Sequence, residues 1–482
     1  MSQNVEDETR QTEINENTIT ISEIPGKPFS LTVEFPLFLN MLSFGLAGAA
    51  ISNLILYRTC VHSLNHTESE CSVFLSLKKN NETQHLENEV QQYATMVNTV
   101  KSVIESLAPA LLSMFLGVWS DTYGRKPLIV WPLFGIAITG MLTVVYSMMN
   151  NLGPWWYILT VVPYSLTGGF TLLFTGAYCY MSDSTTKEKR SLRMTILEAS
   201  VSVGSVIGSL LSSYVLKAVG QVYLLLIMTT LNVFAYAFAN VCLKESVTGA
   251  VQGGLNSVLD WLLVKEMTRE CFKKRPNHGR AQILLLTFAN SLTIFILYGL
   301  ISLEYLYTRE KLHWSIKNYT IFSAVNTMIS FIGGFFGIMV VQRFLHVGDL
   351  TFVNIAFLST IAEYVIKALA VESWHMYLAG GVAVFKGLSS PLIRSLLTKI
   401  LPLEDIAKVF ALMSAVEALC PLLSPVMYNS LYEFTIGTFP GAIYFLSAAI
   451  SVLCVIFVGF VQYYRWNVSS PYQPLHYEEG IQ

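Results

Sequence analysis

The recurrence of long apolar segments is the feature that most limits what this chain can fold into. Segments of about 20 predominantly apolar residues, the length that an α-helix needs to cross a bilayer, follow one another through the whole sequence. Helices satisfy their own backbone hydrogen bonds in lipid, so this pattern is typical of an all-α membrane protein. We predict twelve transmembrane helices, at 32–57, 93–117, 128–150, 154–182, 191–216, 220–243, 281–307, 318–342, 349–371, 374–400, 404–432 and 437–464.

The composition agrees with a membrane protein and excludes other classes. Hydrophobic residues make up 53% of the chain and charged residues 13%. The formal net charge of -2 gives no basic field, so we expect no nucleic-acid partner. The sequence contains no cluster with metal-ligand spacing, no nucleophile elbow and no phosphate-binding loop. We therefore expect no enzymatic activity, no metal site and no cofactor.

The distribution of lysine and arginine predicts the orientation and the domains. Most of the 30 basic residues fall in connections that are cytosolic if the N-terminus is inside. The central basic loop contains a segment, 255–276, that is either an amphipathic helix on the anionic inner surface or a simple positive-inside anchor. The predicted parts are a cytosolic N-terminal tail (1–31), an N-terminal six-helix bundle (32–243), a cytosolic central loop (244–280), a C-terminal six-helix bundle (281–465) and a cytosolic C-terminal tail (466–482).

One long external loop, 58–92, carries signs of a secretory environment. Asn65 and Asn81 each begin an Asn-x-Thr glycosylation sequence, and we predict that both are glycosylated. Cys60 and Cys71 share the loop, where oxidation is allowed. They form either a short disulfide or two free thiols, because sequence does not reveal pairing geometry.

A short charged segment, GVWSDTYGRK, follows the second predicted span. Gly117 permits close helix approach and Gly124 a tight turn, while Asp121 can pair with Arg125 or cap a helix. With Lys126, every keyed position resembles the loop between the second and third helices of the major facilitator superfamily. The resemblance implies two six-helix bundles that rock about a midplane site, with this loop as a cytosolic latch favouring the outward-open conformation. The alternative is a plain tight turn that carries positive-inside charges.

A polar stripe crosses the fifth predicted span. An ionisable residue inside a span costs about 2.5–3.5 kcal/mol on insertion scales, so it requires a partner, a wet cavity or a function. The stripe favours a cavity-facing proton site at the glutamate, and the alternative is a packing seam of small residues. Its members recur every three or four positions and share one helical face: Glu198, Ser202, Ser205, Ser209 and Ser212.

Basic residues in the tenth predicted span are candidates for binding an anion. Lys386 and Arg394 fall on one stripe with a spacing of four, and the guanidinium of arginine offers a bidentate fork to a carboxylate or phosphate. Alternatively, Arg394 extends to the inner headgroups. Glu417, in the eleventh span, is a secondary proton-coupling candidate. Two further pairs are expected to neutralise each other within their helices: Lys101 with Glu105, and Glu363 with Lys367.

Three segments together resemble solute carrier family 46: RMTILEASVSVGS, GLSSPLIRSLLTK and WSDTYGRKPL. This family includes the proton-coupled folate transporter and carriers linked to muropeptides and cyclic dinucleotides. The resemblance implies that Glu198 takes part in proton coupling and that Arg394 takes part in proton and substrate binding. Ser202 and Ser205 are assigned to the substrate path with Lys386.

The expected function is proton-coupled symport of a polar organic anion toward the cytosol. The partners are then a small organic anion, protons and the lipid bilayer, with a proton gradient as the driving force. The substrate is expected to be folate-like, a muropeptide or a cyclic dinucleotide. Two alternatives stay open: a proton-independent facilitator or lysosomal exporter, and a transporter-like receptor or scaffold.

The C-terminal tail contains a possible sorting signal. Tyr472 and Leu475 fit the tyrosine-x-x-bulky pattern that clathrin adaptors bind. A clathrin adaptor is therefore a candidate partner, and the plasma membrane and the endolysosomal membrane are both candidate locations.

Overall fold

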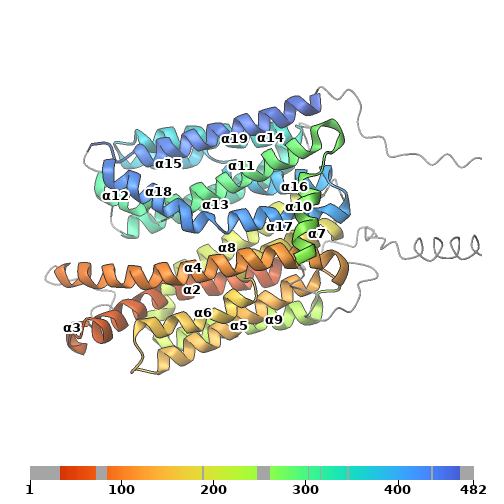
Figure 1. Ribbon diagram of the computed structural model, residues 1–482. Coiled ribbons are helices and arrows are strands. Elements are labelled where there is room, and N and C mark those ends of the chain that lie inside the picture. The colour runs from red at the N-terminus through yellow and green to blue at the C-terminus, as the bar shows by residue number, and fades with distance from the viewer. Residues whose placement is uncertain are drawn as a thin grey trace, which may run out of the picture. The chain divides into compact units, whose positions relative to one another are not determined.

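The structure is a computed structural model. It describes residues 33–71, 84–186, 189–246, 261–301, 303–314, 316–342, 344, 347–435 and 438–466. Every regular element in these ranges is a helix (Figure 1). The C-terminal tail with Tyr472 and Leu475, and the acceptor Asn81, lie outside the described residues.

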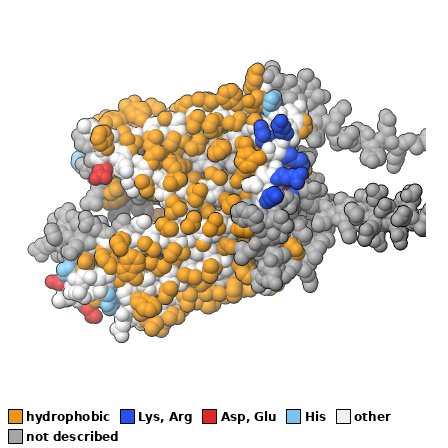
Figure 2. All heavy atoms as spheres, viewed as in Figure 1, with side chains coloured by type: hydrophobic (Ala, Val, Ile, Leu, Met, Phe, Trp, Pro, Cys, Tyr) orange, Lys and Arg blue, Asp and Glu red, His pale blue; other side chains and the backbone are white. Residues whose placement is uncertain are grey.

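The spanning helices confirm the predicted membrane architecture. Eleven helices in the described ranges are long and apolar enough to cross a membrane, and a bent pair brings the number to 12 if it is one span. The largest shift concerns the seventh span, which runs from Pro276 to Leu300 and thus begins and ends earlier than predicted. Hydrophobic side chains cover the sides of the helices in Figure 2, as expected for surfaces that face lipid.

The first compact unit contains Met1–Met267 together with Leu401–Leu422. Helix α8 packs along α2 in the most extensive helix contact of the protein, and α17 packs on α4 and α7. The segment Leu401–Leu422, which the sequence analysis places in the C-terminal bundle (281–465), is thus grouped with this unit by its contacts. The helices of this unit are α2 (Glu34–Arg58), α4 (Gln84–Tyr123), α5 (Lys126–Met148), α6 (Tyr157–Leu166), α7 (Gly169–Ser184), α8 (Arg190–Val219), α9 (Gln221–Cys242) and α17 (Leu403–Glu417).

The second unit contains Thr268–Ile400 and Leu423–Gln482. Its core is aromatic, and Tyr307, Tyr364 and Tyr444 are all buried in it. Helix α10 (Trp261–Phe272) lies in the predicted central loop and extends across the division between the units. The other helices are α11 (Gly279–Leu300), α12 (Leu303–Leu312), α13 (Ile316–Phe336), α14 (Asp349–Ala368), α15 (Ser373–Val382), the short η8 (Lys386–Leu388), α16 (Ser389–Ile400), most of α18 (Cys420–Thr435) and α19 (Ala442–Trp466).

Three of the described spans are interrupted near their middle, the last of them between α17 and α18. Gly168 and Gly169 separate α6 from α7 with φ angles of 86° and 48°, which only glycine adopts without strain. The second break separates α15 from η8 and α16, whose axes differ by 42°. Breaks of this kind free backbone groups from the helical ladder and occur in transporters where a cavity must be lined. Lys386 directly follows the second break, as the first residue of η8.

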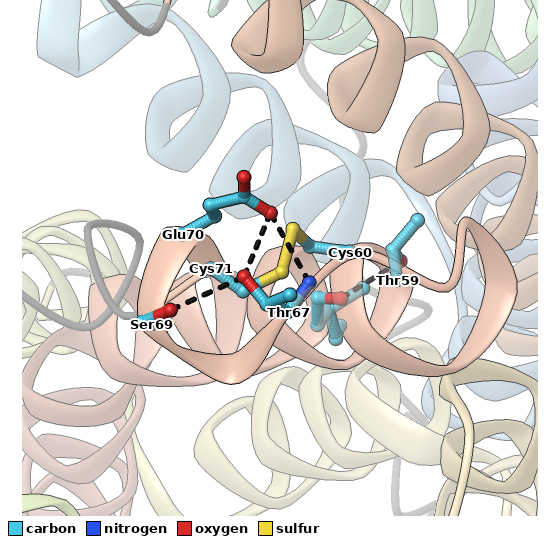
Figure 3. The surroundings of a disulfide bond; sticks show 7 residues. Thr59, Cys60, Thr67, Ser69, Glu70 and Cys71 are labelled. Atoms are coloured by element: carbon cyan, nitrogen blue, oxygen red, sulfur yellow. Dashed lines mark hydrogen bonds between the residues drawn. A yellow bond between two sulfur atoms is a disulfide. The ribbon is translucent and has the colours of Figure 1, made fainter.

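The loop predicted at 58–92 contains a disulfide between Cys60 and Cys71, with Cα atoms 5.8 Å apart (Figure 3). The bond joins the π-helical turn Thr59–Ser63 to α3 (Glu68–Cys71). Between them, the exposed Asn65 adopts a left-handed φ of 55°. The bond thus closes the part of the loop that presents this glycosylation acceptor.

Thr67 and Glu70 stabilise the turn inside the disulfide loop. The Thr67 hydroxyl donates to Glu70 Oε2 at 2.8 Å and its backbone N–H donates to the same oxygen at 3.2 Å. These two hydrogen bonds lower the pKa of the Glu70 carboxyl. Because this pKa is lowered, the carboxylate keeps its charge and both hydrogen bonds until the pH falls through its pKa in the folded protein. The turn therefore persists in a mildly acidic compartment.

Alkylation under denaturing conditions tests the disulfide. Without reductant, we expect labelling of the five cysteines that are free in the structure, and after reduction labelling of all 7. In a Cys60→Ser variant the remaining cysteines should be labelled equally with and without reductant, because Cys71 has lost its partner. Complete labelling of the unreduced wild-type protein by mass spectrometry would contradict the assignment.

Candidate functional site

Glu198 lies about two turns into α8 and contacts another helix of the same unit. Its Oε1 accepts a short hydrogen bond from the hydroxyl of Tyr178 on α7. Tyr178 is buried and packs edge-on against Phe410 of α17, with ring centroids 6.3 Å apart. The carboxylate is therefore held by protein groups, although it is not fully enclosed.

The polar stripe of α8 divides into two parts. Ser212 is buried, and its hydroxyl donates to the Leu46 carbonyl of α2 at 2.6 Å. It belongs to the packing seam between these helices. Glu198, Ser202 and Ser205 are only partly buried. The packing seam thus describes the stripe at Ser212, and the proton site at Glu198 stays a prediction.

Glycines bring α2 and α8 into backbone contact. Gly45 faces α8, where an added Cβ would lie 2.5 Å from the Ser205 carbonyl oxygen. On α8, Gly204 faces α2 in the same way, with the Phe38 carbonyl oxygen 2.6 Å from an added Cβ. Small residues permit such close approach of helices in membranes. Gly48, one turn further along α2, faces open space.

Two alanine substitutions in α2 test this seam. Gly45→Ala is expected to lower the unfolding free energy by about 1–3 kcal/mol, because the new methyl group cannot fit against the α8 backbone. Gly48→Ala is the matched control and should be neutral or slightly stabilising, since alanine favours helix and meets nothing within 4 Å. Denaturant titrations of the purified protein measure both. Equal losses in the two variants would contradict close packing at Gly45.

Helix α17 adds polar and small residues to the first unit. The Ser414 hydroxyl forms a 2.6 Å hydrogen bond with Thr175 of α7, and both groups are buried. Gly117 lies against Ala411, and an added Cβ would overlap the alanine side chain. The close helix approach predicted at Gly117 is thus present. Glu417, the secondary candidate, ends α17 and is partly buried.

The loop after α4 contains a buried ion pair. Arg125 Nε lies 3.0 Å from Asp183 Oδ2 of α7, and both side chains are fully buried. Arg125 also donates to Ser120 Oγ at 2.6 Å. The side chain of Asp121, the partner considered from the sequence, lies outside the described residues. Asp183 is thus a partner of Arg125 that sequence reasoning missed.

Glu245, which follows the C-terminal end of α9, binds the backbone of the same loop. Its carboxylate accepts the backbone N–H groups of Arg125 and Lys126, at 2.6 and 3.1 Å. Gly124 has a φ of 112°, and the carboxylate occupies the space that a Cβ would fill there. Glycine is therefore required at this turn for its backbone angle and for its lack of a side chain.

The second unit contains a chain of four charges. Lys367 Nζ lies 2.6 Å from Glu304 and 2.7 Å from Glu363, and Lys386 Nζ lies 2.9 Å from the other Glu363 oxygen. The neutralisation predicted for Glu363 and Lys367 is present, and so is a 3.0 Å pair between Lys101 and Glu105 in the first unit. The links to Glu304 and Lys386 were not predicted. The chain contains equal numbers of positive and negative charges.

The tenth span is bent rather than one straight helix through 374–400, and the bend follows Val382. Lys386 and Arg394 both lie after it, in the helical segment Lys386–Ile400, which begins with the 3-10 turn of η8 and continues as α16. Lys386 stacks over the Tyr364 ring at 4.7 Å. Its side chain is 33% exposed, so it remains accessible despite its pairing with Glu363.

Arg394 is 4% exposed on α16, a helix that packs on α11 and α14. Its Nε donates to Ser390 Oγ at 3.3 Å. Protein surrounds this guanidinium, so extension into the headgroup layer does not describe its position. Glu198 and Arg394 belong to different units, and the expectation that they face one passage stays a prediction.

The residues that sequence reasoning missed share one property. Tyr178, Asp183 and Glu304 pair with predicted residues from other helices, at sequence separations of 20, 58 and 63. For Asp183 the sequence did contain a signal. Asp183 lies at the end of the span Pro154–Ser184, which returns the chain to the side of the Arg125 loop. Among the described residues, no cluster of three or more histidine, cysteine or acidic side chains could hold a metal ion.

The structure thus contains two helical units with interrupted spans and buried charges. The sequence also matches the model of a known protein family. The model of the Major Facilitator Superfamily matches residues 35–425. The chain belongs to the Major Facilitator Superfamily. The human organic anion transporter MFSD10 shares the fold with a TM-score of 0.66 at 14% identity, over 90% of this chain and 100% of that one. The predicted superfamily and fold are confirmed.

Relatives within the superfamily carry the name of solute carrier family 46. The probable peptidoglycan muropeptide transporter SLC46 of Drosophila melanogaster is 28% identical over 474 residues, 94% of this chain and 91% of the relative. The lysosomal proton-coupled steroid conjugate and bile acid symporter SLC46A3 of Gallus gallus is 24% identical over 89% of this chain and 92% of the relative. These similarities agree with the resemblance found in the sequence, and the protein is a multi-pass membrane transporter of the Major Facilitator Superfamily.

Proposed function

We propose that this transporter is a proton-coupled symporter that moves a polar organic anion toward the cytosol. The observation that carries the proposal is the Glu198 carboxylate, held by the Tyr178 hydroxyl inside a spanning helix. A carboxylate inside a span is costly unless it has a function, and this one is still partly accessible. It can accept and release a proton as access alternates.

The anion would bind to basic groups of the second unit. Arg394 offers a planar fork of donors, and Lys386 offers an accessible ammonium. If Lys386 leaves Glu363 to bind the anion, Glu363 keeps its second partner, Lys367. Lys367 would then be shared by Glu363 and Glu304, while Lys386 would be neutralised by the bound anion. In the first unit, Ser202 and Ser205 are proposed to line the substrate path.

The loop around Arg125 is proposed to be the cytosolic latch of this cycle. Its members are Gly117, Asp121, Gly124, Arg125 and Lys126, and Asp183 joins them as the acceptor of the buried ion pair. A fully buried pair of this kind stabilises one arrangement of the loop over others. Both termini and the loop are then cytosolic, and the Cys60–Cys71 loop with its glycan on Asn65 is external.

The location is proposed to be the plasma membrane or the endolysosomal membrane. The chicken relative is named as lysosomal, and the tail of this chain contains the Tyr472 and Leu475 pattern that clathrin adaptors recognise. An acidic lumen or exterior would supply the protons. No cofactor is required, because the proton gradient supplies the free energy.

A solute panel in proteoliposomes tests the proposed function. The panel contains a muropeptide, a folate, a cyclic dinucleotide and a sulfated steroid, each labelled. We expect at least one to accumulate inside when the exterior is acidic, and a protonophore to abolish the accumulation. Equal uptake with and without the gradient would identify a facilitator. Binding without counterflow would identify a receptor, and either result would overturn symport.

A further inference from the structure

A basic hollow of about 690 Å³ lies at the ends of two spanning helices of the second unit. The span of α11 begins at Pro276, and that of α19 ends at Arg465. Figure 2 shows lysine and arginine side chains gathered at the end of the view where α10 and the end of α19 lie in Figure 1. The hollow is lined by Lys274, Arg275, Asn277, His278, Arg280, Ala281, Tyr463 and Tyr464.

The lining of the hollow carries a concentrated positive charge. It contains three lysine and arginine side chains and one histidine, and no acidic residue. In the part of the chain that the structure describes, neither Lys274 nor Arg280 forms an ion pair, whereas the neighbouring Lys273 already pairs with Glu270 at 3.0 Å. Cations that converge without a carboxylate repel each other and favour an anionic ligand.

The wall of the hollow is held in a strained, fixed shape. Asn277 and His278 both have a left-handed φ of 56°, which is uncommon for residues other than glycine. Gln282 stabilises this turn by donating to the Asn277 carbonyl at 2.8 Å, and His278 stacks on Tyr464 with ring centroids 4.7 Å apart. Such backbone strain persists only where the surroundings enforce it. The basic side chains therefore project from a defined turn.

The position of the hollow along the helices indicates what kind of molecule reaches it. It lies where the spans of α11 and α19 end, at the level of the lipid headgroups. Tyr463 is 60% exposed there, and tyrosine is enriched at membrane interfaces. A ligand can therefore enter from the headgroup layer, without leaving the membrane.

We propose that this hollow binds the headgroup of a phosphoinositide, a lipid with more than one phosphate monoester. Each monoester carries a charge of about -1.5 to -2, so two of them match a hollow that holds both Lys274 and Arg280 better than one carboxylate or phosphodiester does. Free inositol phosphates share this chemistry. The lipid is the favoured source because the hollow lies at headgroup level. This site is independent of the transport site and binds without transport.

Binding of a short-chain phosphatidylinositol bisphosphate to the purified full-length protein in detergent tests the proposal. A Lys274→Gln/Arg280→Gln variant is expected to bind about 30-fold more weakly, given about 1 kcal/mol for each basic residue. The matched control is Lys265→Gln/Arg269→Gln, which removes the same charge from exposed positions of α10 outside the hollow. It should change affinity less than about threefold. If the double variant does not fold, the single variant Lys274→Gln, at an exposed position, replaces it. This variant should bind the lipid about fivefold more weakly than the wild-type protein.

Two further ligands complete the test. Phosphatidylserine of the same chain length should bind at least tenfold more weakly than the bisphosphate lipid, since it lacks phosphate monoesters. Free inositol trisphosphate should also bind more weakly, because it has no acyl chains in the membrane layer. Equal losses in the two double variants would show a diffuse charge effect and overturn the site. Equal or tighter binding of phosphatidylserine or of the free headgroup would overturn the proposed ligand.

Discussion

The Asp183→Asn variant is expected to lose about 3–5 kcal/mol of unfolding free energy, because it breaks the fully buried ion pair between Asp183 and the Arg125 guanidinium. Asparagine preserves the shape of the side chain, so the loss reports charge and not packing. The hydrogen bond from Arg125 to Ser120 remains but does not neutralise the guanidinium. Denaturant titration of the purified protein in detergent measures the change.

An exposed ion pair provides the control for Asp183→Asn. Glu270→Gln removes the acidic partner of Lys273, whose side chain is 59% exposed, and should cost at most about 1 kcal/mol. A second check is Arg125→Met combined with Asp183→Asn, which should cost less than the sum of the single changes, because neither charge then stays buried alone. Similar losses for Asp183→Asn and Glu270→Gln would contradict a buried pair at the latch.

Arg394→Lys is expected to raise the KM for the transported anion about 10- to 100-fold. Lysine keeps the charge but replaces a two-pronged donor with a point charge, and one charge-assisted hydrogen bond contributes about 1.5–3 kcal/mol. Concentration-dependent uptake of the solute found in the panel measures the effect. Since proton loading is assigned to Glu198, the response to an imposed proton gradient should persist at saturating solute.

Lys399→Arg is the matched control for Arg394→Lys. Lys399 lies on the same helix, α16, but pairs with Asp349 at 2.5 Å near the end of the span. Arginine can keep this pair, so we expect an unchanged KM and protein of normal stability. If Arg394→Lys transported with the wild-type KM, the anion would not bind at the guanidinium and the substrate site would have to be placed elsewhere.

The spans could be predicted from sequence because membrane solvation acts on each segment separately. A helix must bury about 20 apolar residues whatever the other helices do, so the segment 128–150 was predicted close to Lys126–Met148. The roles of Gly117 and Gly124 could also be predicted, because close helix approach and a positive φ are local requirements that each need glycine. The loop resemblance then supplied the superfamily.

The partners of the charged residues could not be predicted in the same way. The contacts of Arg125 with Asp183 and of Glu198 with Tyr178 depend on how helices pack, and sequence spacing says nothing about packing between helices. The tenth span shows the other limit. Its apolar content fits one helix, so the bend after Val382 could not be predicted from the pattern of apolar residues.

Concentrative uptake by the Glu198→Gln variant in proteoliposomes tests the central claim most directly. Glutamine keeps the size of the side chain and a hydrogen-bonding oxygen for Tyr178, but it cannot take up a proton. We predict that the variant still exchanges labelled for unlabelled solute at equilibrium, yet no longer accumulates solute when the exterior is acidified. Accumulation equal to that of the wild-type protein under the same gradient would contradict proton coupling through Glu198.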